Sequence, residues 1–155
     1  MTIIAIPVMD RVHLLDLAGP AQVFGDAAAL GSDFELCFIK DGEQPISSAQ
    51  GLALAPESKW PDLSVTDLIL VPGGSAPEVK SASILSSASL QRLSEHGSRG
   101  GRVASVCSGA ISLGLAGLLD GRRCTTHHEL QQGLAARFPA ANVISDVLLP
   151  RTATF

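Results

Sequence analysis

The stretch RVASVCSGAISL, residues 102–113, decides the fold of this chain, because an apolar strand in it passes directly into a helix. Cys107 stands at the junction, with the small residues Ser105 two positions before it and Gly109 two positions after it. A sharp strand-to-helix turn needs such small flanks, and it exposes the cysteine above the carboxyl edge of a sheet. The helix N-terminus is expected to favour the thiolate; an inert cysteine at a packed strand end is the alternative.

Strand and helix patterns alternate on both sides of this junction. Apolar strands are expected at 2–8, 34–39, 67–71, 102–106 and 142–149, and helices at 17–30, 83–98, 108–119 and 128–138. Residues 44–62 are expected to form edge strands or a loop. Continuous apolar strands are typical of a parallel sheet covered on both faces. The alternation predicts an α/β fold, a flavodoxin-like three-layer sandwich with a mainly parallel central sheet.

The composition fits one domain over residues 1–155. Hydrophobic residues make up 46% of the chain and charged residues 17%, which excludes a disordered protein. No apolar run approaches the ~20 residues of a membrane span, and the first residues lack the pattern of a signal peptide. Three widely spaced cysteines without a CxxC pair indicate a reduced, cytoplasmic protein.

Charge is distributed unevenly along the chain. The net charge of −4 argues against a nucleic-acid-binding surface. Residues 1–80 carry four Lys or Arg against eleven Asp or Glu, whereas residues 81–155 carry seven against four. The basic half could face an anionic partner, but scattered solubilising arginines are the simpler interpretation. Residues 150–155 resemble neither a helix end nor a polar tail, so a chain truncated at its C-terminus is expected.

Two glycines follow the strand expected at 67–71. Gly73 and Gly74 would let the backbone approach a ligand closely. The amides of Gly74 and Ser108 could then form an oxyanion hole beside the Cys107 sulfur. A simple strand-to-loop turn is the alternative interpretation of the two glycines.

Asp16 places one carboxylate inside the apolar run LLDLAG, residues 14–19. It could cap the helix that follows. Its place after the first strand also sends it to the sheet edge that carries Cys107, where it could bind the sulfur or a ligand, or transfer a proton. Both interpretations stay open.

The segment TTHH at 125–128 follows a predicted turn. Thr126 is expected to cap the next helix, with Glu129 as its capping-box partner. His127 could reach the Cys107 pocket or be purely structural. The sequence holds neither HxxxH nor CxxC spacing and no GxGxxG or GxxxxGK[ST] motif, so no metal and no cofactor are expected.

Four blocks of the sequence resemble the class I glutamine amidotransferase-like superfamily, the ThiJ/PfpI group. They are LLDLAGPAQVF at 14–24, DLILVPGG at 67–74, VASVCSGAISLGLAGLLDGRRCTTHHEL at 103–130 and LAARFP at 134–139. The third block is most similar to the N-terminal domain of AraC-family transcriptional regulators. The resemblance implies a domain that senses a ligand or mediates dimerisation. A C-terminal pair of helix-turn-helix motifs, absent from residues 1–155, would bind DNA.

The resemblance also implies roles for single residues. Cys107 matches the elbow cysteine of the group, and Gly74 matches its oxyanion-side glycine. Asp16 matches the acidic partner in isonitrile-hydratase-like relatives, and His127 matches a histidine at the pocket edge. Ser108 stands where protease-like members have a histidine, so a Cys–His dyad is not expected.

Two functions agree with these residues. The first is the sensing domain of an AraC-type regulator, a homodimer that binds a small metabolite and no membrane. Its ligand-binding residues would be Gly73, Gly74, Ser108 and His127. The second is a cysteine-dependent enzyme of the isonitrile hydratase or a related hydrolase type, with Cys107 and Asp16 as catalytic residues. A redox sensor acting through Cys107 is a third interpretation. We favour the regulator domain.

Overall fold

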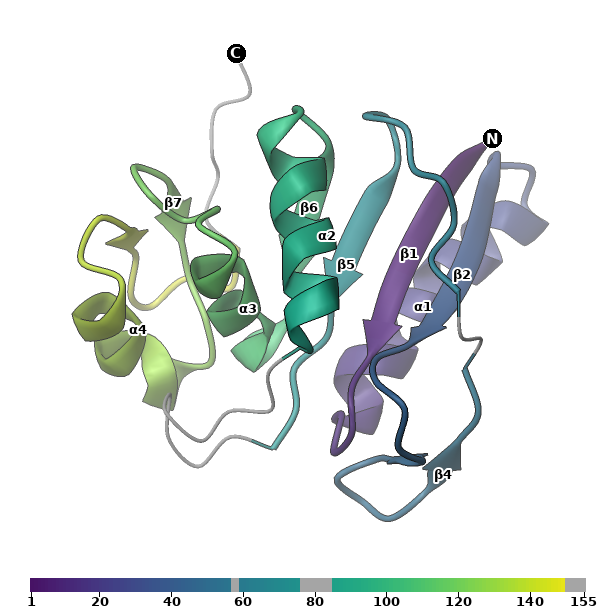
Figure 1. Cartoon of the computed structure of the whole chain (residues 1–155), viewed down its shortest axis with the longest axis horizontal. Helices are drawn as coiled ribbons and strands as arrows, with labels where there is room; N and C mark the ends of the chain where they lie inside the picture. The colour runs from purple at the N-terminus through teal and green to yellow at the C-terminus, as the bar shows by residue number, and fades with distance from the viewer. Residues whose placement is uncertain (57–58, 76–84, 150–155) are drawn as a thin grey trace.

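Four parallel strands form the central sheet of the molecule (Figure 1). The computed structural model describes residues 1–56, 59–75 and 85–149. The sheet order is β2-β1-β5-β6, and each neighbouring pair is parallel. Its strands are β1 (Thr2–Val8), β2 (Phe34–Lys40), β5 (Leu68–Val71) and β6 (Arg102–Ser105). The predicted mainly parallel sheet is confirmed.

Helices cover both faces of this sheet. In Figure 1, α1 (Leu14–Ala29) lies behind β1 and β2, whereas α2 (Ser87–Ser98) lies in front of β6 and α3 (Ala110–Leu115) lies beside α2. Parallel neighbours need such crossover connections, because the chain must return to the same end of the sheet. The predicted three-layer α/β sandwich is therefore confirmed.

Each face of the sheet buries its own apolar cluster. Under α1, the side chains of Ile4, Ile6 and Leu70 are buried against the helix. The larger cluster joins the opposite face to α2 and α3, and its fully buried members include Ile69, Val71, Leu93 and Ile111. Burying one such side chain contributes about 1.5–3 kcal/mol. The two clusters therefore fix the strands whose carboxyl ends carry the site residues between the two helix layers.

Two small sheets lie outside the central one. β3 (Ile46–Ser47) and β4 (Ala53–Leu54) pair antiparallel within residues 44–62, where edge strands or a loop were expected, and they form a sheet of their own. β7 (Arg123–Cys124), which the sequence did not predict, pairs in parallel with β8 (Asn142–Val143). The strand expected over 142–149 is thus only two residues long, since Asp146 adopts a φ of +59° and interrupts the extended run.

The first two helices begin at other residues than expected. α1 begins at Leu14 instead of residue 17, which places Pro20 in its interior. α2 begins at Ser87, because the Ser86 side chain caps it by accepting a hydrogen bond from the Ser89 amide. Part of the expected range of this helix, residues 83–84, lies outside the described residues.

The other two predicted helices are split. The range 108–119 begins within the 3-10 turn η2 (Cys107–Gly109), which is followed by α3, and α3 ends before Gly117 with its φ of +74°. The range 128–138 contains the 3-10 turn η3 (His128–Leu130) followed by α4 (Gln131–Arg137). Within the described ranges, every helix is too short or too polar to cross a membrane.

Candidate functional site

Segments after β1 and β5 are bound to each other at the carboxyl edge of the central sheet. Val12, between β1 and α1, forms an antiparallel bridge with Gly74, which follows β5. Next to it, the His13 amide donates a hydrogen bond to the Gly73 carbonyl oxygen at 3.0 Å. These bonds fix the start of α1 beside the glycine pair, and β6 delivers Cys107 to the same edge.

Cys107 occupies the sharp turn between β6 and η2. Its φ is +54°, a left-handed conformation that residues with a Cβ rarely adopt. Such strain costs about 1–3 kcal/mol and persists only where the surroundings enforce it. The Val106 amide does so by donating to the Val71 carbonyl oxygen at 2.9 Å. Gly109 is required as well, because a Cβ there would overlap the same oxygen.

Gly73 lies at the bottom of the site and has no room for a side chain. A Cβ at this position would overlap Oδ2 of Asp16 and would lie 2.9 Å from the Cys107 Cβ and 3.0 Å from the Ser108 amide nitrogen. The glycine therefore lets three functional groups from α1 and η2 converge. The role that the sequence predicts for Gly73, close approach of the backbone to a ligand, stays a prediction, because the neighbours here are two side chains and one backbone amide of the protein itself.

Asp16 projects into the site from the first turn of α1. Its carboxylate, the Cys107 Sγ and a ring nitrogen of His13 lie within 4.8 Å of one another. The N-cap position of α1 belongs to His13, which makes no capping bond with its side chain, so Asp16 is not the helix cap. Asp16 was expected either to cap the helix or to lie beside Cys107, and in the structure it lies beside Cys107.

His13 is the part of this cluster that the sequence reasoning missed. Its Nδ1 lies 3.7 Å from Oδ2 of Asp16. Among the described residues, that buried Oδ2 has no hydrogen-bond partner. The signal was the spacing of three residues between His13 and Asp16, which places both side chains on one side of a helix start.

The expectation of a favoured thiolate at Cys107 is wrong in this environment. Burial raises the pKa of the Cys107 thiol, and the negative charge of Asp16 raises it further, to about 11. A hydrogen bond from the Ser108 backbone acts in the opposite direction but is weaker than these two effects. The helix N-terminus is therefore outweighed, because desolvation and a like charge both disfavour an anion on sulfur.

Ser108 joins η2 to the loop after β5. Its Oγ accepts a hydrogen bond from the Gly74 amide at 2.9 Å and donates one to the Gly74 carbonyl oxygen at 3.1 Å. The Gly74 amide, expected to stabilise an oxyanion, is thus occupied by a hydroxyl group. In this arrangement the expected oxyanion hole lacks one of its two donors.

A pocket of about 490 Å³ opens beside Cys107. Its walls come from the junction of β6 and η2, from the chain around the start of η3 and α4, and from the segment after β8: residues 105–107, 125–128, 131 and 146–148. His127 therefore lies in the wall of the pocket that holds Cys107. Thr126 does not cap a helix as expected, because its Oγ1 donates to the Cys107 carbonyl oxygen at 2.8 Å.

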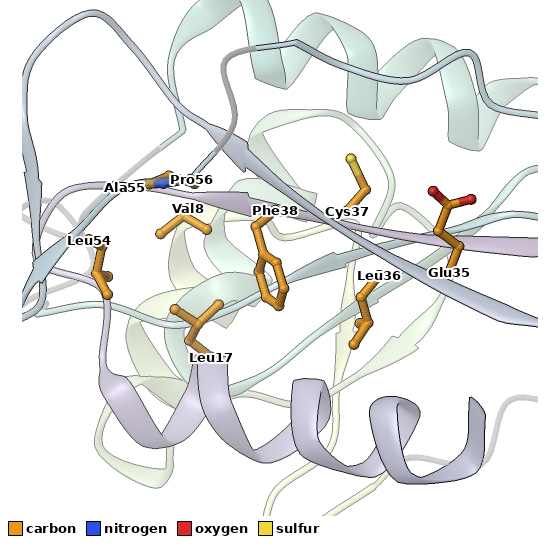
Figure 2. Close-up of a pocket in the computed structure, with 9 residues that line it drawn as sticks. All are labelled: Val8, Leu17, Glu35, Leu36, Cys37, Phe38, Leu54, Ala55 and Pro56. Atoms are coloured by element: carbon orange, nitrogen blue, oxygen red, sulfur yellow. The ribbon is translucent and has the colours of Figure 1, made fainter. Parts of the chain in front are cut away.

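A second pocket, of about 410 Å³, lies along the edge strand β2 (Figure 2). Leu36 and Phe38 extend from β2 toward Leu17 of α1, while Cys37 extends from the other side of the strand. The lining is mostly apolar, and it contains none of the site residues predicted from the sequence. The chemistry-bearing groups gather instead around Cys107.

Two groups of side chains in the described residues have the composition and spacing of metal ligands. One is His13, Asp16 and Cys107, all half-buried. The other is His127, His128 and Glu129, of which the last two are exposed. The sequence spacing did not connect Cys107 to His13 and Asp16, because these two residues lie at the start of α1 whereas Cys107 follows β6.

Comparison with known proteins places the chain in a family. The model of the DJ-1/PfpI family matches residues 2–149. An uncharacterized protein in the cpoL 5′ region of Streptomyces lividans is 38% identical over 137 residues, which are 88% of this chain and 95% of that protein. Isonitrile hydratase of Pseudomonas putida is 34% identical over 131 residues, and the chain spans 54% of its length.

Further similarities extend to regulators and to solved structures. The HTH-type transcriptional regulator GbdR of Pseudomonas aeruginosa is 29% identical over 99 residues, which are 64% of this chain and 26% of GbdR. A ThiJ/PfpI family protein from Pseudomonas syringae has a TM-score of 0.77 and 29% identity. The match covers 97% of this chain and 59% of the Pseudomonas syringae chain. An AraC family regulator from Pseudomonas putida shares the fold, with a TM-score of 0.75 and 23% identity. The match covers 93% of this chain and 76% of that regulator's chain. The resemblance seen in the sequence is thus confirmed, and the chain belongs to the DJ-1/PfpI family.

Proposed function

We propose that this chain is the ligand-sensing domain of an AraC-type transcriptional regulator and binds a small molecule in the pocket beside Cys107. The observation that supports this proposal most directly is the Gly74 amide, which is hydrogen-bonded to the Ser108 hydroxyl at 2.9 Å. Catalysis at an elbow cysteine needs free donors aimed at the charge that develops on the substrate. A donor already occupied by the protein suits a site that binds and does not turn over its ligand.

The pocket itself suits a small polar ligand. Its volume of about 490 Å³ lies within the range of small-molecule sites. Polar side chains converge on it from three segments, with His127, Gln131 and Asp146 among its lining residues. These groups can hydrogen-bond a ligand with both donors and acceptors, so we expect a metabolite that carries both kinds of group.

The regulator proposal includes partners that lie outside this domain. GbdR is named as an HTH-type regulator, and the chain matches 26% of its length. We propose that DNA is bound by a separate domain, and that the ligand changes the activity of that domain by favouring one of two states. We place this function in the cytoplasm, and we propose a homodimer, since a two-fold assembly matches a palindromic operator. A monomer in light scattering at working concentration would overturn the homodimer.

Thermal unfolding with a panel of amino acids, amines and carboxylates tests the sensing proposal. A ligand present at a hundred times its Kd adds about 2.7 kcal/mol to stability and raises Tm. We expect a saturable rise in Tm with one chemical class. His127→Trp, which fills part of the pocket, should abolish that rise, whereas the control Arg99→Ala, remote from the pocket, should retain it. A rise that persists in His127→Trp would contradict binding in this pocket.

A specific observation also favours a second function, isonitrile hydration. Asp16 lies beside Cys107 as that reaction requires, and the 34% identical relative is named isonitrile hydratase. In such a reaction the Cys107 sulfur bonds to the isonitrile carbon while Asp16 transfers the thiol proton to the same carbon, which gives a thioimidate. Water then adds to this carbon, the nitrogen is protonated and the C–S bond breaks. The products are an N-formamide and the free thiol.

One assay separates the two functions. A short alkyl isonitrile is incubated with the wild type and with Cys107→Ala, and the formamide is followed by NMR. The regulator proposal predicts the same background rate with both proteins. Formamide that forms only when Cys107 is present would establish the hydratase and overturn the proposal of a site without turnover.

A further inference from the structure

We propose that His13, Asp16 and Cys107 form a binding site for a divalent cation of the zinc class. The three side chains meet although His13 and Asp16 come from the start of α1 and Cys107 follows β6. Their candidate ligand atoms, an imidazole nitrogen, a carboxylate oxygen and the sulfur, all lie within 4.8 Å of one another. Bond lengths of about 2.0 Å to nitrogen or oxygen and 2.3 Å to sulfur hold two ligand atoms on one ion at most about 4.3 Å apart, so these side chains would need only a small adjustment to bind it.

The strongest support comes from the buried oxygen of Asp16. The Asp16 side chain is only 14% exposed, and its Oδ2 has no hydrogen-bond partner in the described part of the chain. A buried polar atom without a partner is costly and calls for an explanation, such as an ion bound to it.

The contact between Asp16 and His13 does not satisfy this oxygen. At 3.7 Å, the distance from His13 Nδ1 to Asp16 Oδ2 exceeds that of a hydrogen bond. A cation between them would bind both atoms at shorter range. The imidazole is 37% exposed, so an ion can reach the site from solvent along the His13 side.

The chemistry of the three ligand atoms, one nitrogen, one oxygen and one sulfur, indicates which class of ion would bind. Nitrogen and thiolate sulfur favour zinc and its neighbours, whereas Mg²⁺ and Ca²⁺ are bound by oxygen ligands. On binding, the Cys107 thiol releases its proton to solvent and the sulfur forms a bond to the metal, while neutral His13 donates a lone pair. One thiolate and one carboxylate then balance the two positive charges of the ion. Three protein ligands leave a fourth position open for water or a ligand.

Titration of the chelator-treated chain with Co²⁺ tests the site, because a thiolate ligand gives a sulfur-to-cobalt charge-transfer band. Zn²⁺ should displace Co²⁺ with a stoichiometry of one ion per chain. We expect the band to disappear in Cys107→Ala, and Zn²⁺ affinity to fall about a hundredfold in Asp16→Asn and in His13→Gln. His13 is partly exposed, so His13→Gln tests the site even if another variant fails to fold.

Two controls separate this site from other metal binding. The double variant His128→Ala/Glu129→Gln removes the two exposed members of the other ligand group and should keep both the charge-transfer band and the Zn²⁺ affinity. Cys37→Ala removes another thiol and should also keep the band. No Co²⁺ or Zn²⁺ binding by the wild type, a band that survives in Cys107→Ala, or unchanged affinity in His13→Gln would overturn the proposal.

Discussion

Two carboxylates at opposite ends of the central sheet have contrasting surroundings. Asp67, at the amino end of β5, accepts hydrogen bonds from the Ile3 amide at 2.8 Å, the Ser64 amide at 2.7 Å and the Ser64 hydroxyl at 2.8 Å. Asp16, at the carboxyl edge, keeps a buried Oδ2 without a hydrogen-bond partner in the described residues. One end of the sheet therefore satisfies its carboxylate within the protein, and the other leaves it available.

The pKa of Asp67 reflects this difference. Burial raises the pKa of Asp67, but the hydrogen bonds from Ile3 and Ser64, helped by the nearby His96, outweigh burial and lower it below its ordinary value. His96 also contacts the Asp67 backbone, with 3.1 Å between its Nε2 and the carbonyl oxygen. The comparison indicates that Asp67 serves stability, and we propose that Asp16 serves the site beside Cys107.

The largest effect is expected from removing the two carboxylates in turn. Asp67→Ala leaves the amides of Ile3 and Ser64 without their acceptor and should lower the free energy of unfolding by about 3 kcal/mol. Asp16→Ala removes an unsatisfied oxygen and should change it by less than about 1 kcal/mol. Urea unfolding of both variants measures the difference. Equal losses would show that Asp16 is as structural as Asp67.

A somewhat smaller effect is expected from adding one methyl group to the site. In Gly73→Ala the Cβ would overlap Asp16 Oδ2, so we expect a loss of about 2 kcal/mol in the free energy of unfolding. Gly25→Ala, inside α1, is the matched control. Its Cβ would lie at an ordinary 3.7 Å from Leu36, and it should stabilise the protein by about 0.5–1 kcal/mol. A stable Gly73→Ala would contradict the tight approach of α1 and η2.

The reactivity of Cys107 is the third test of this comparison. With its pKa at about 11, the thiol should be alkylated slowly at pH 8, and the rate should rise with pH toward that value. Asp16→Asn removes a negative charge, which lowers the pKa and should speed alkylation at pH 8 about tenfold. Peptide mass mapping in the presence of a chelator measures the rate at Cys107. An alkylation rate that is the same in the wild type and in Asp16→Asn would show that Asp16 does not influence the pKa of Cys107.

The smallest effect concerns the response to acid. Because the folded protein lowers the pKa of Asp67, its contribution to stability is present above the ordinary value of 3.8 and is lost as the pH falls through the lower folded pKa. Asp67→Asn should therefore show a shallower loss of stability between about pH 5 and about pH 2. Urea midpoints over this range measure the slope. An unchanged slope would assign the acid response to other carboxyl groups.

The fold was predictable because the apolar strands are continuous and the loops between them carry glycine or proline. The short elements were harder to predict. Gly117, with its positive φ, ends α3 before the predicted residue 119, although glycine is a common helix end. Asp146 has a positive φ that is uncommon outside glycine, within the range where the strand was expected to continue. The bounds of α2 depend on which serine caps it, and several serines are present near its start.

The candidate site was predictable only in part. The place of Cys107 followed from the size of its neighbours, and the place of Asp16 from the strand before it. The pKa of Cys107 could not be foreseen, because it depends on burial and on the distance to Asp16. The role of His13 and the occupied Gly74 amide could not be foreseen either, since they arise from contacts between residues far apart in the sequence.

The paired hydrogen bonds between Ser108 and Gly74 bear on how such domains change function during evolution. One hydroxyl group occupies the Gly74 amide beside Cys107. Losing that hydroxyl, as in Ser108→Ala, would release an N–H group next to a cysteine that already has an acidic neighbour. A domain with this pair of hydrogen bonds is therefore one substitution away from the free N–H donor that an enzyme of this type would need, and one substitution in the opposite direction would remove that donor again.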